Sequence, residues 1–232
     1  YGAKQYASIA SNGANGKPDF NTAVSPADWG LLARKVTEKC DALDGLSDGL
    51  IGDTAACQKA FSIERDVPTC ASGKGEGSCL SAAQKTVLGN IFKGARNGTG
   101  QALYDSFPWD SGVGASNYRF WEYTAAQNLD PGAVAFIFMT PPASFKEFVS
   151  ASGLQYALNF NLDTDAPRIF ATNATYTTSA MDFMAPPAPH DLSRLRQRGG
   201  KLMVFHGVSD AVFSSNDTAA RYDKLNAAEG GT

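Results

Sequence analysis

The chain has 232 residues, of which 43% are hydrophobic, enough to bury the core of one large domain or two smaller ones. Its 20 basic and 23 acidic residues give a net charge of −3, and the basic ones are scattered, so the composition does not indicate a nucleic-acid partner. No apolar run approaches the roughly 18 residues of a transmembrane helix, so we expect no membrane partner either.

Two helices are predicted in the amino-terminal part. The first is a short one within residues 2–9. The second begins at Ser25-Pro26-Ala27-Asp28, where Ser is the expected N-cap, Pro takes the first helical position and Asp takes the third. It runs to about Lys39, and its expected buried stripe consists of Trp29, Leu32, Ala33 and Val36.

This helix leads into an acidic segment bracketed by Cys40 and Cys57. The segment contains Asp41, Asp44, Asp48 and Asp53, interleaved with Gly45, Gly49 and Gly52. Carboxylates this close repel one another unless a cation lies among them or they all point into water. Glycine turns let several oxygens converge, and oxygen ligands are those that Ca²⁺ takes. The spacing is not that of an EF-hand, so a calcium site and a solvated acidic turn both remain open.

The chain has four cysteines, Cys40, Cys57, Cys70 and Cys79. None forms a C-x-x-C pair and the two histidines are distant in sequence, which argues against a zinc site. We favour two local disulfides, Cys40–Cys57 and Cys70–Cys79, each worth roughly 3 kcal/mol in the chain-entropy model. Counting alone leaves the other two connectivities open. Disulfides indicate an oxidising compartment, so we expect a secreted or periplasmic protein.

Two further helices are predicted between residues 54 and 95. A short one at 54–61 carries Cys57 and Phe61. A longer one begins at Ser81 and Gln84, which have the spacing of a capping box. Its apolar face is expected to comprise Val87, Leu88, Ile91, Phe92 and Ala95.

Residues 97–142 are rich in aromatics and have a loop-like composition. The aromatics are Tyr104, Phe107, Trp109, Tyr118, Phe120, Trp121 and Tyr123. Filling the core is the favoured interpretation, and lining a pocket for a flat ligand is the alternative. The Pro141-Pro142 pair ends an apolar run, after which residues 143–159 predict a helix with Phe145, Phe148 and Val149 inward.

A boundary is predicted at Pro186, Pro187 and Pro189, after which the sequence changes in character. Asp191–Arg198 predicts a short helix ended by Gly199-Gly200. Lys201–Phe205 predicts a buried strand, and a helix follows from about Asp217 to Ala228. This succession of helix, strand, turn and helix is typical of an α/β fold.

Asp210 follows the predicted strand, and functional side chains of open α/β sheets lie on such turns. It is interpreted either as a turn residue or as the acid of a Ser-His-Asp triad, which orients the histidine. The GLSDG sequence around Ser47 matches a nucleophile elbow, but it follows a helix rather than a strand, so we reject it. His190 and His206 precede Asp210, contrary to the order expected of the triad base, and are interpreted as structural or loop residues. A complete triad is therefore not expected within these residues.

Over nearly its whole length the chain resembles the tannase and feruloyl esterase family. The motifs that carry the resemblance are CDALDGLSDGLIGDTAAC, VPTC with GSCLSAAQK, SFPWDSGV, FMTPP and RGGKLMVFHGVSDAVFS. The resemblance implies an α/β-hydrolase with a large inserted lid domain. Residues 1–188 would form the lid, and residues 189–232 would return into the catalytic domain.

The resemblance also implies roles for particular residues. A structural Ca²⁺ would be held by the side chains of Asp41, Asp44 and Asp48 and the carbonyls of Leu46 and Leu50. The Cys40–Cys57 disulfide would close that loop, and Cys70–Cys79 would be a second lid disulfide. Asp210 would be the triad acid, Phe213 would contact the substrate, and Trp121 would belong to an aromatic wall.

The family places its nucleophilic serine in a C-S-x-G-G segment and its catalytic histidine in an N-H-C segment, and neither occurs here. We therefore expect this chain to be an internal part of a secreted serine esterase, inactive alone and completed by the remainder of the hydrolase domain. Its substrate would be a small aromatic ester of the feruloyl, galloyl or terephthaloyl type. The alternatives are a non-catalytic, calcium-stapled binding module for aromatic ligands and a purely structural lid.

Overall fold

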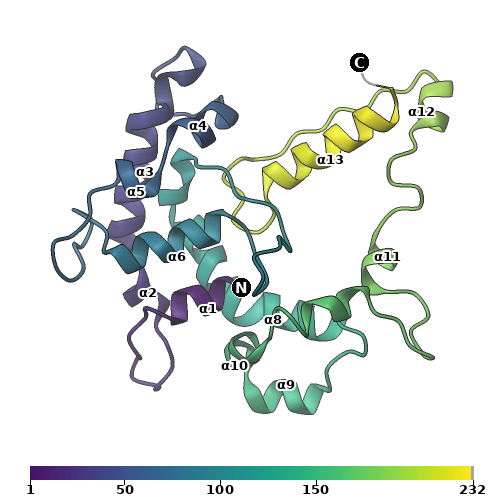
Figure 1. Cartoon of the computed structure of the whole chain (residues 1–232), viewed down its shortest axis with the longest axis horizontal. Helices are drawn as coiled ribbons and strands as arrows, with labels where there is room; N and C mark the ends of the chain where they lie inside the picture. Colours follow the sequence, from purple (N-terminus) through teal and green to yellow (C-terminus); the bar gives the residue numbers. More distant parts are fainter. Residues whose placement is uncertain (231–232) are drawn as a thin grey trace.

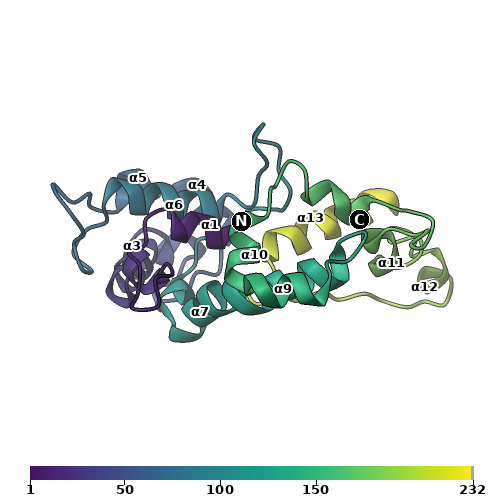
Figure 2. The same cartoon turned by 90° about the horizontal axis from the view of Figure 1, so that it is seen from below.

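The computed structural model describes residues 1–230, without the side chain of Glu147, and the regular structure of these residues is helical. A body formed by the first half of the chain lies beside a long carboxyl-terminal segment that returns toward it (Figures 1 and 2). Up to residue 114 the helices are α1 (Gly2–Ala7), α2 (Phe20–Ala23), α3 (Pro26–Cys40), η1 (Asp41–Asp44), α4 (Thr54–Ala60), α5 (Ile63–Asp66), α6 (Ala82–Phe92) and η2 (Ser111–Gly114).

From residue 116 the helices are α7 (Ser116–Phe120), η3 (Trp121–Leu129), α8 (Asp130–Ala133), η4 (Val134–Phe138), α9 (Phe145–Ala151), α10 (Gly153–Asn159), η5 (Ala166–Phe170), α11 (Ala180–Met184), α12 (Ser193–Gln197) and α13 (Ser215–Ala228). Between residues 1 and 230, β-structure is limited to isolated bridges such as Thr69–Leu80. The α/β prediction is therefore not confirmed within these residues. No helix in this range is long and apolar enough to cross a membrane.

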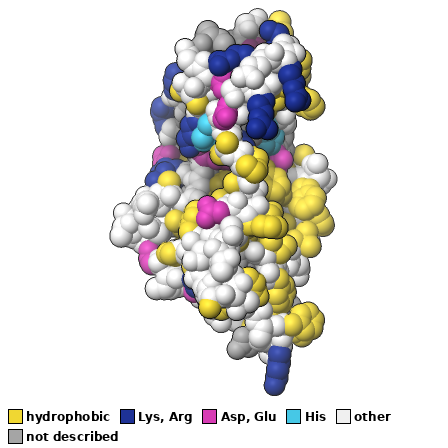
Figure 3. Space-filling view, turned by 90° about the vertical axis from the view of Figure 1, so that its right-hand side faces the viewer, with side chains coloured by type: hydrophobic (Ala, Val, Ile, Leu, Met, Phe, Trp, Pro, Cys, Tyr) yellow, Lys and Arg dark blue, Asp and Glu magenta, His cyan; other side chains and the backbone are white. Residues whose placement is uncertain are grey.

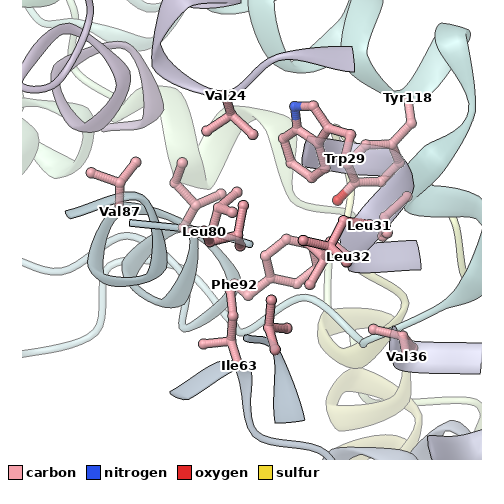
Figure 4. Close-up of a cluster of buried hydrophobic side chains, with 14 of the residues drawn as sticks. Val24, Trp29, Leu31, Leu32, Val36, Ile63, Leu80, Val87, Phe92 and Tyr118 are labelled. Carbon is pink, nitrogen blue, oxygen red and sulfur yellow. The ribbon is translucent and has the colours of Figure 1, made fainter. Parts of the chain in front are cut away.

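The core of the body forms around α3, which confirms the helix predicted from Ser25 to about Lys39. Ser25 and Asp28 make a reciprocal capping box with Pro26 at the helix start. Trp29, Leu32 and Val36 have no exposed surface and pack with residues of α6 and α7 (Figure 4), whereas Ala33 is only partly buried. One apolar face of a helix thus organises the body, because it is the face that removes most apolar area from water.

The predicted α6 is confirmed, with a capping box between Ser81 and Gln84. Its predicted apolar face is buried up to Phe92, where the helix ends, so Ala95 lies outside it. Both favoured disulfides are also present. Cys40–Cys57 ties the end of α3 to α4, and Cys70–Cys79 closes a loop between α5 and α6.

The loop-like interpretation of residues 97–142 is wrong from residue 116 onward, where α7, η3, α8 and η4 follow one another without interruption. The stretches Trp121–Leu129 and Val134–Phe138 are π-helical. A π-helix bonds residue i to i+5. The buried positions of this stretch include the polar Glu122, whereas the apolar Phe120 and Trp121 are half exposed, so the apolar pattern does not mark the buried face.

The single inward-facing helix predicted at 143–159 is also wrong. Ser152, with φ of 68°, separates α9 from α10 and caps α10 through its side chain. Phe145 is 73% exposed and Val149 is 58% exposed, while Phe148 packs with Phe136 and Tyr156. The apolar residues of α9 therefore lack a partner on one side within the described part of the chain.

The buried strand predicted at Lys201–Phe205 is not confirmed within residues 1–230. The segment is neither paired with another strand nor buried, and Met203 and Phe205 are 84% and 92% exposed. Hydrophobic side chains are visible at the surface on the side of α11 and α12 (Figure 3). The flanking helices are confirmed as α12 and α13, with Gly199 at φ of +67° ending the α12 turn. A strand requires a neighbour for its backbone bonds, and no described segment supplies one.

Candidate functional site

Asp210 lies in a turn between the extended residues 201–207 and α13. Its Oδ1 accepts hydrogen bonds from the backbone N–H groups of Val212 at 2.8 Å and Phe213 at 2.9 Å. Burial acts to raise the pKa of the Asp210 carboxyl, but these two N–H donors and His206 outweigh it, so the pKa lies below its usual value. The turn thus holds an ionised carboxylate whose Oδ1 is bound by its own backbone and whose other oxygen, Oδ2, faces His206.

His206 lies next to this carboxylate. Its Nε2 is 3.5 Å from Asp210 Oδ2, and its Nδ1 is 2.7 Å from Thr218 Oγ1 in the first turns of α13. A general base needs one ring nitrogen free to face the nucleophile. Because Asp210 and Thr218 occupy both nitrogens, His206 has the contacts of a structural residue, in line with the sequence interpretation.

The contact between His206 and Asp210 was nevertheless missed from the sequence. The two residues are four positions apart, a spacing that brings side chains together on a helix but not on an extended strand. Here the turn at Val208-Ser209, closed by a 3.2 Å hydrogen bond from Asp210 N to the Gly207 carbonyl, reverses the chain and brings them together.

A solvent-open hollow of about 550 Å³ lies beside Asp210. Its lining includes Asp210, Val212 and Phe213 from the turn, and Tyr118 and Trp121 from the helical body. Phe213 is 65% exposed and Trp121 is 42% exposed. The structure thus brings together the three residues that the sequence singled out for catalysis and substrate contact, although nearly ninety positions separate Trp121 from Asp210.

Trp121 is placed by its two buried neighbours. The Tyr123 hydroxyl accepts a hydrogen bond from Trp29 Nε1 at 2.8 Å and donates one to the Val24 carbonyl at 2.6 Å. Glu122 accepts a hydrogen bond of 2.6 Å from the Tyr6 hydroxyl. Because Glu122 and Tyr123 are fixed in the core, the indole ring of Trp121 points outward. The aromatic cluster is therefore divided, since Tyr118 and Tyr123 fill the core whereas Phe120 and Trp121 remain half exposed.

Glu122 is the most perturbed carboxyl of the body. Burial raises its pKa to about 7, the hydrogen bond from Tyr6 opposes that shift, and the charge of Asp130 adds to it. The pair anchors η3 to α1. It is a structural element behind the hollow, because both side chains are directed into the core.

The acidic loop is exposed and hydrogen-bonded to its own backbone. Asp41 Oδ1 accepts from the N–H groups of Asp48 and Gly49, and Asp48 Oδ1 accepts from Leu50. Asp44 accepts from Leu46 and from Gly52, and these two bonds lower the pKa of its carboxyl. Gly45 and Gly49 have φ of +94° and +83°, which a side chain would disfavour. Asp53 caps α4 instead.

The donors of this loop suit calcium in chemical type, because they are carboxylates and carbonyls accessible to solvent. Their placement does not yet form a site. Among the described residues, no three His, Cys, Asp or Glu side chains converge closely enough to hold a metal ion. Each oxygen of Asp44 accepts one backbone N–H bond, which leaves a further lone pair on each oxygen.

Comparison with known proteins places this geometry in context. A family model described as tannase and feruloyl esterase matches residues 1–232. Mono(2-hydroxyethyl) terephthalate hydrolase of Piscinibacter sakaiensis is 33% identical over 242 residues, covering 93% of this chain and 39% of that protein. A probable feruloyl esterase B-1 of Neosartorya fischeri is 27% identical, covering 89% of this chain and 35% of that protein. The chain thus spans less than two fifths of these relatives.

Solved structures agree on the fold. Feruloyl esterase B from Aspergillus oryzae matches with a TM-score of 0.60 and 22% identity, over all of this chain and 40% of that one. A tannin acyl hydrolase from Aspergillus niger matches with a TM-score of 0.60 and 16% identity, over 99% of this chain and 41% of that one. At such identities the likeness concerns the fold alone.

Proposed function

The chain belongs to the tannase and feruloyl esterase family, and from this membership we propose that it is part of a serine esterase acting on aromatic carboxylic esters. The proposed substrates are small esters of the feruloyl, galloyl or terephthaloyl type. The named activities of the relatives, terephthalate monoester and feruloyl ester hydrolysis, support this class.

In the proposed mechanism a serine attacks the ester carbonyl, and a histidine takes the serine proton and then gives it to the leaving alcohol. Both groups would be supplied by the remainder of the hydrolase domain. Asp210 would orient the histidine and stabilise its cation. The observation that carries this assignment is the ionised Asp210 carboxylate, held by the backbone of its own turn at the edge of a hollow lined by Trp121 and Phe213.

Phe213 and Trp121 would hold the aromatic part of the substrate from two sides. They come from different parts of the chain, one from the Asp210 turn and one from the start of η3. Half-exposed aromatic rings facing open space offer a large apolar area for stacking against a planar acyl group.

We propose that the chain divides into a lid, residues 1–188, and a part of an α/β-hydrolase core, residues 189–232. The exposed apolar side chains of residues 202–205 support this division, because an extended run of Leu, Met, Val and Phe has the composition of a strand buried on both faces of a parallel sheet. The partner strands would come from the remainder of the hydrolase domain.

The proposed protein is secreted or periplasmic, and the two disulfides support an oxidising compartment. We further propose that Ca²⁺ binds the acidic loop through Asp41, Asp44, Asp48 and the carbonyls of Leu46 and Leu50. Its role would be structural, to hold the loop in a single conformation.

The test of the proposed function is the Asp210→Ala substitution in the full-length protein, with methyl ferulate, methyl gallate and mono(2-hydroxyethyl) terephthalate as substrates. We expect kcat to fall by roughly 10⁴-fold, as for loss of a triad acid. His206→Ala is the matched control, because His206 touches the same carboxylate, and we expect a much smaller loss. Wild-type turnover by the Asp210 variant would refute the assignment.

A binding module for aromatic ligands is the second candidate, favoured by the same exposed rings of Trp121 and Phe213. It predicts that the full-length protein binds ferulic, gallic or terephthalic acid without hydrolysing any of the three esters. Calorimetry with the free acids, beside the hydrolysis assay, separates the two functions.

A further inference from the structure

The SFPWDSGV motif has no role in the function proposed above, and its residues lie against the Asp210 turn. Asp110 is only 4% exposed although it carries a carboxylate. Its Oδ2 accepts a hydrogen bond from the N–H of Gly112 at 2.8 Å and a short one from the Ser209 hydroxyl. Ser209 immediately precedes Asp210. A buried carboxylate of the helical body therefore holds the neighbour of the proposed triad acid.

The approach of the two segments is so close that it requires glycine at position 112. A Cβ added to Gly112 would overlap Ser209 Oγ and lie 2.8 Å from Asp110 Oδ2. The backbone of the motif thus forms the surface on which Ser209 rests. This contact joins residues 99 positions apart, so it fixes the turn relative to the body rather than within itself.

The other end of the turn is held by the same segment. The Tyr104 hydroxyl accepts a 2.9 Å hydrogen bond from Ser214 N, and the Ser106 carbonyl accepts one from the Ser214 hydroxyl. Asn216 Nδ2 donates to Ser106 Oγ at 3.1 Å. Ser214 has no exposed surface. The segment 104–112 therefore fixes the turn on both sides of Asp210.

The segment 104–112 is itself anchored to the body. The Gln58 amide donates to the Phe107 carbonyl at 3.2 Å and accepts from the Trp109 N–H at 2.9 Å. Trp109 stacks on Phe92 with ring centroids 4.0 Å apart and an interplanar angle of 12°. Gln58 follows Cys57 of the first disulfide. The support of the turn thus extends to α4, which the Cys40–Cys57 disulfide ties to the end of α3.

We propose that Asp110 is a positioning residue of the esterase reaction, acting through Ser209 on the placement of Asp210. This inference rests on the proposed function, in which Asp210 orients the catalytic histidine. The N–H groups of Val212 and Phe213 fix the Asp210 carboxylate only relative to its own turn. Asp110 fixes the turn relative to the body that carries Trp121, so it sets where the carboxylate meets the histidine and where the substrate ring lies.

The test uses the full-length protein with Asp110→Ala, Ser209→Ala and the double variant, and measures kcat, KM and thermal unfolding with an ester that the unmodified protein hydrolyses. Displacement of a catalytic group by about 1 Å can cost 10²-fold, so we expect each single variant to lower kcat about 10-fold with little change in KM. The double variant is expected to lose no more than the more affected single variant, because both changes break one contact.

Asp110→Asn is the conservative variant that should restore kcat. Its amide oxygen can accept the same two hydrogen bonds from Gly112 and Ser209, so we expect kcat to return to near the wild-type value. Asp163→Ala is the matched control, because Asp163 accepts a 2.7 Å bond from Gly98 N across 65 positions without touching the Asp210 turn. That variant is expected to melt at a lower temperature with kcat unchanged.

These measurements separate a failure of the role proposed for Asp110 from a failure of the proposed esterase function. If Asp110→Ala and Ser209→Ala lower only the melting temperature, Asp110 merely docks the two segments and the inference is overturned. If Asp110→Ala fails to fold, Ser209→Ala decides, because it removes a single hydroxyl. Asp210→Ala is assayed alongside. Turnover retained by that variant, or no turnover in the unmodified protein, refutes the proposed function and this inference with it.

Discussion

The helical body and the carboxyl-terminal segment contain similar apolar residues in opposite surroundings. Around α3, Trp29, Leu32 and Val36 have no exposed surface. In residues 201–205, Met203 and Phe205 are almost fully exposed. The body has its packing partners within the chain, whereas among residues 1–230 the extended run is covered only in part, on the side of Leu202 and Val204. An apolar sequence therefore shows that a segment can be buried, but it is buried only where another segment packs against it.

The largest expected effect on stability comes from a substitution in the core, compared with one in the exposed run. Trp29→Ala removes the ring that packs on Tyr118 and donates to Tyr123, and core Trp or Phe to Ala changes typically cost about 3–5 kcal/mol. Phe205→Ala, in contrast, is expected to change the unfolding free energy of this chain by less than about 0.5 kcal/mol. Urea unfolding of the 232-residue chain measures both. Equal losses would show that the two regions are packed alike.

The next largest effect on stability comes from removing a disulfide of the body. Replacing Cys40 and Cys57 together by Ser is expected to cost about 2–4 kcal/mol, since an unfolded chain without the cross-link gains entropy. Replacing Cys70 and Cys79 should cost less, because that disulfide closes a loop with a sequence separation of 9 rather than 17. Thermal unfolding of the two double variants measures the difference. A larger loss of stability on removing Cys70–Cys79 would show that this disulfide restricts the unfolded chain more than Cys40–Cys57 does.

A third effect makes the stability of the body depend on pH. The pKa of Glu122 is raised to about 7 in the folded chain, so the folded state binds its proton more tightly than the unfolded state does. Its contribution is therefore complete below about pH 4.5 and is lost as the pH rises through 7, by roughly 3 kcal/mol in total.

Glu122→Gln should abolish this decrease of the unfolding free energy with rising pH. The amide remains neutral at every pH, and it retains an oxygen that accepts the hydrogen bond from the Tyr6 hydroxyl. Glu38→Gln is the matched control, since Glu38 is exposed and paired with Lys35 on the surface of α3. Chemical denaturation between pH 4 and 8 compares the three proteins. A slope that persists in the Glu122 variant would assign it to another group.

The smallest effect concerns the acidic loop. If Ca²⁺ binds there with an affinity typical of extracellular modules, 1 mM Ca²⁺ should stabilise the chain by about 1 kcal/mol. Asp44→Asn should remove this gain while leaving Phe205 and the Asp210 turn unaffected. Melting curves with calcium and with a chelator measure it. An unchanged melting temperature in wild type would favour the solvated acidic turn.

Much of the body was predictable because its determinants are local. The helix starts at Ser25 and Ser81 follow from capping residues three positions apart, and the disulfides pair the first cysteine with the second and the third with the fourth. The long helical stretch from residue 116 does not stand out in the apolar pattern, because the buried Glu122 is polar whereas the apolar Phe120 and Trp121 are half exposed. The exposure of Phe145 and Val149 was missed because a pattern of apolar residues does not reveal whether a neighbour is present.

Local sequence patterns suffice for the starts of α3 and α6 and for the turn that carries Asp210, because these depend on interactions over a few residues. The tertiary structure alone decided that Trp121 and Phe213 lie around one hollow with Asp210, and that Asp110 holds Ser209 across 99 positions. Such contacts depend on how the body folds back on the carboxyl-terminal segment. That path is set by the summed packing of the core, and no local pattern encodes it.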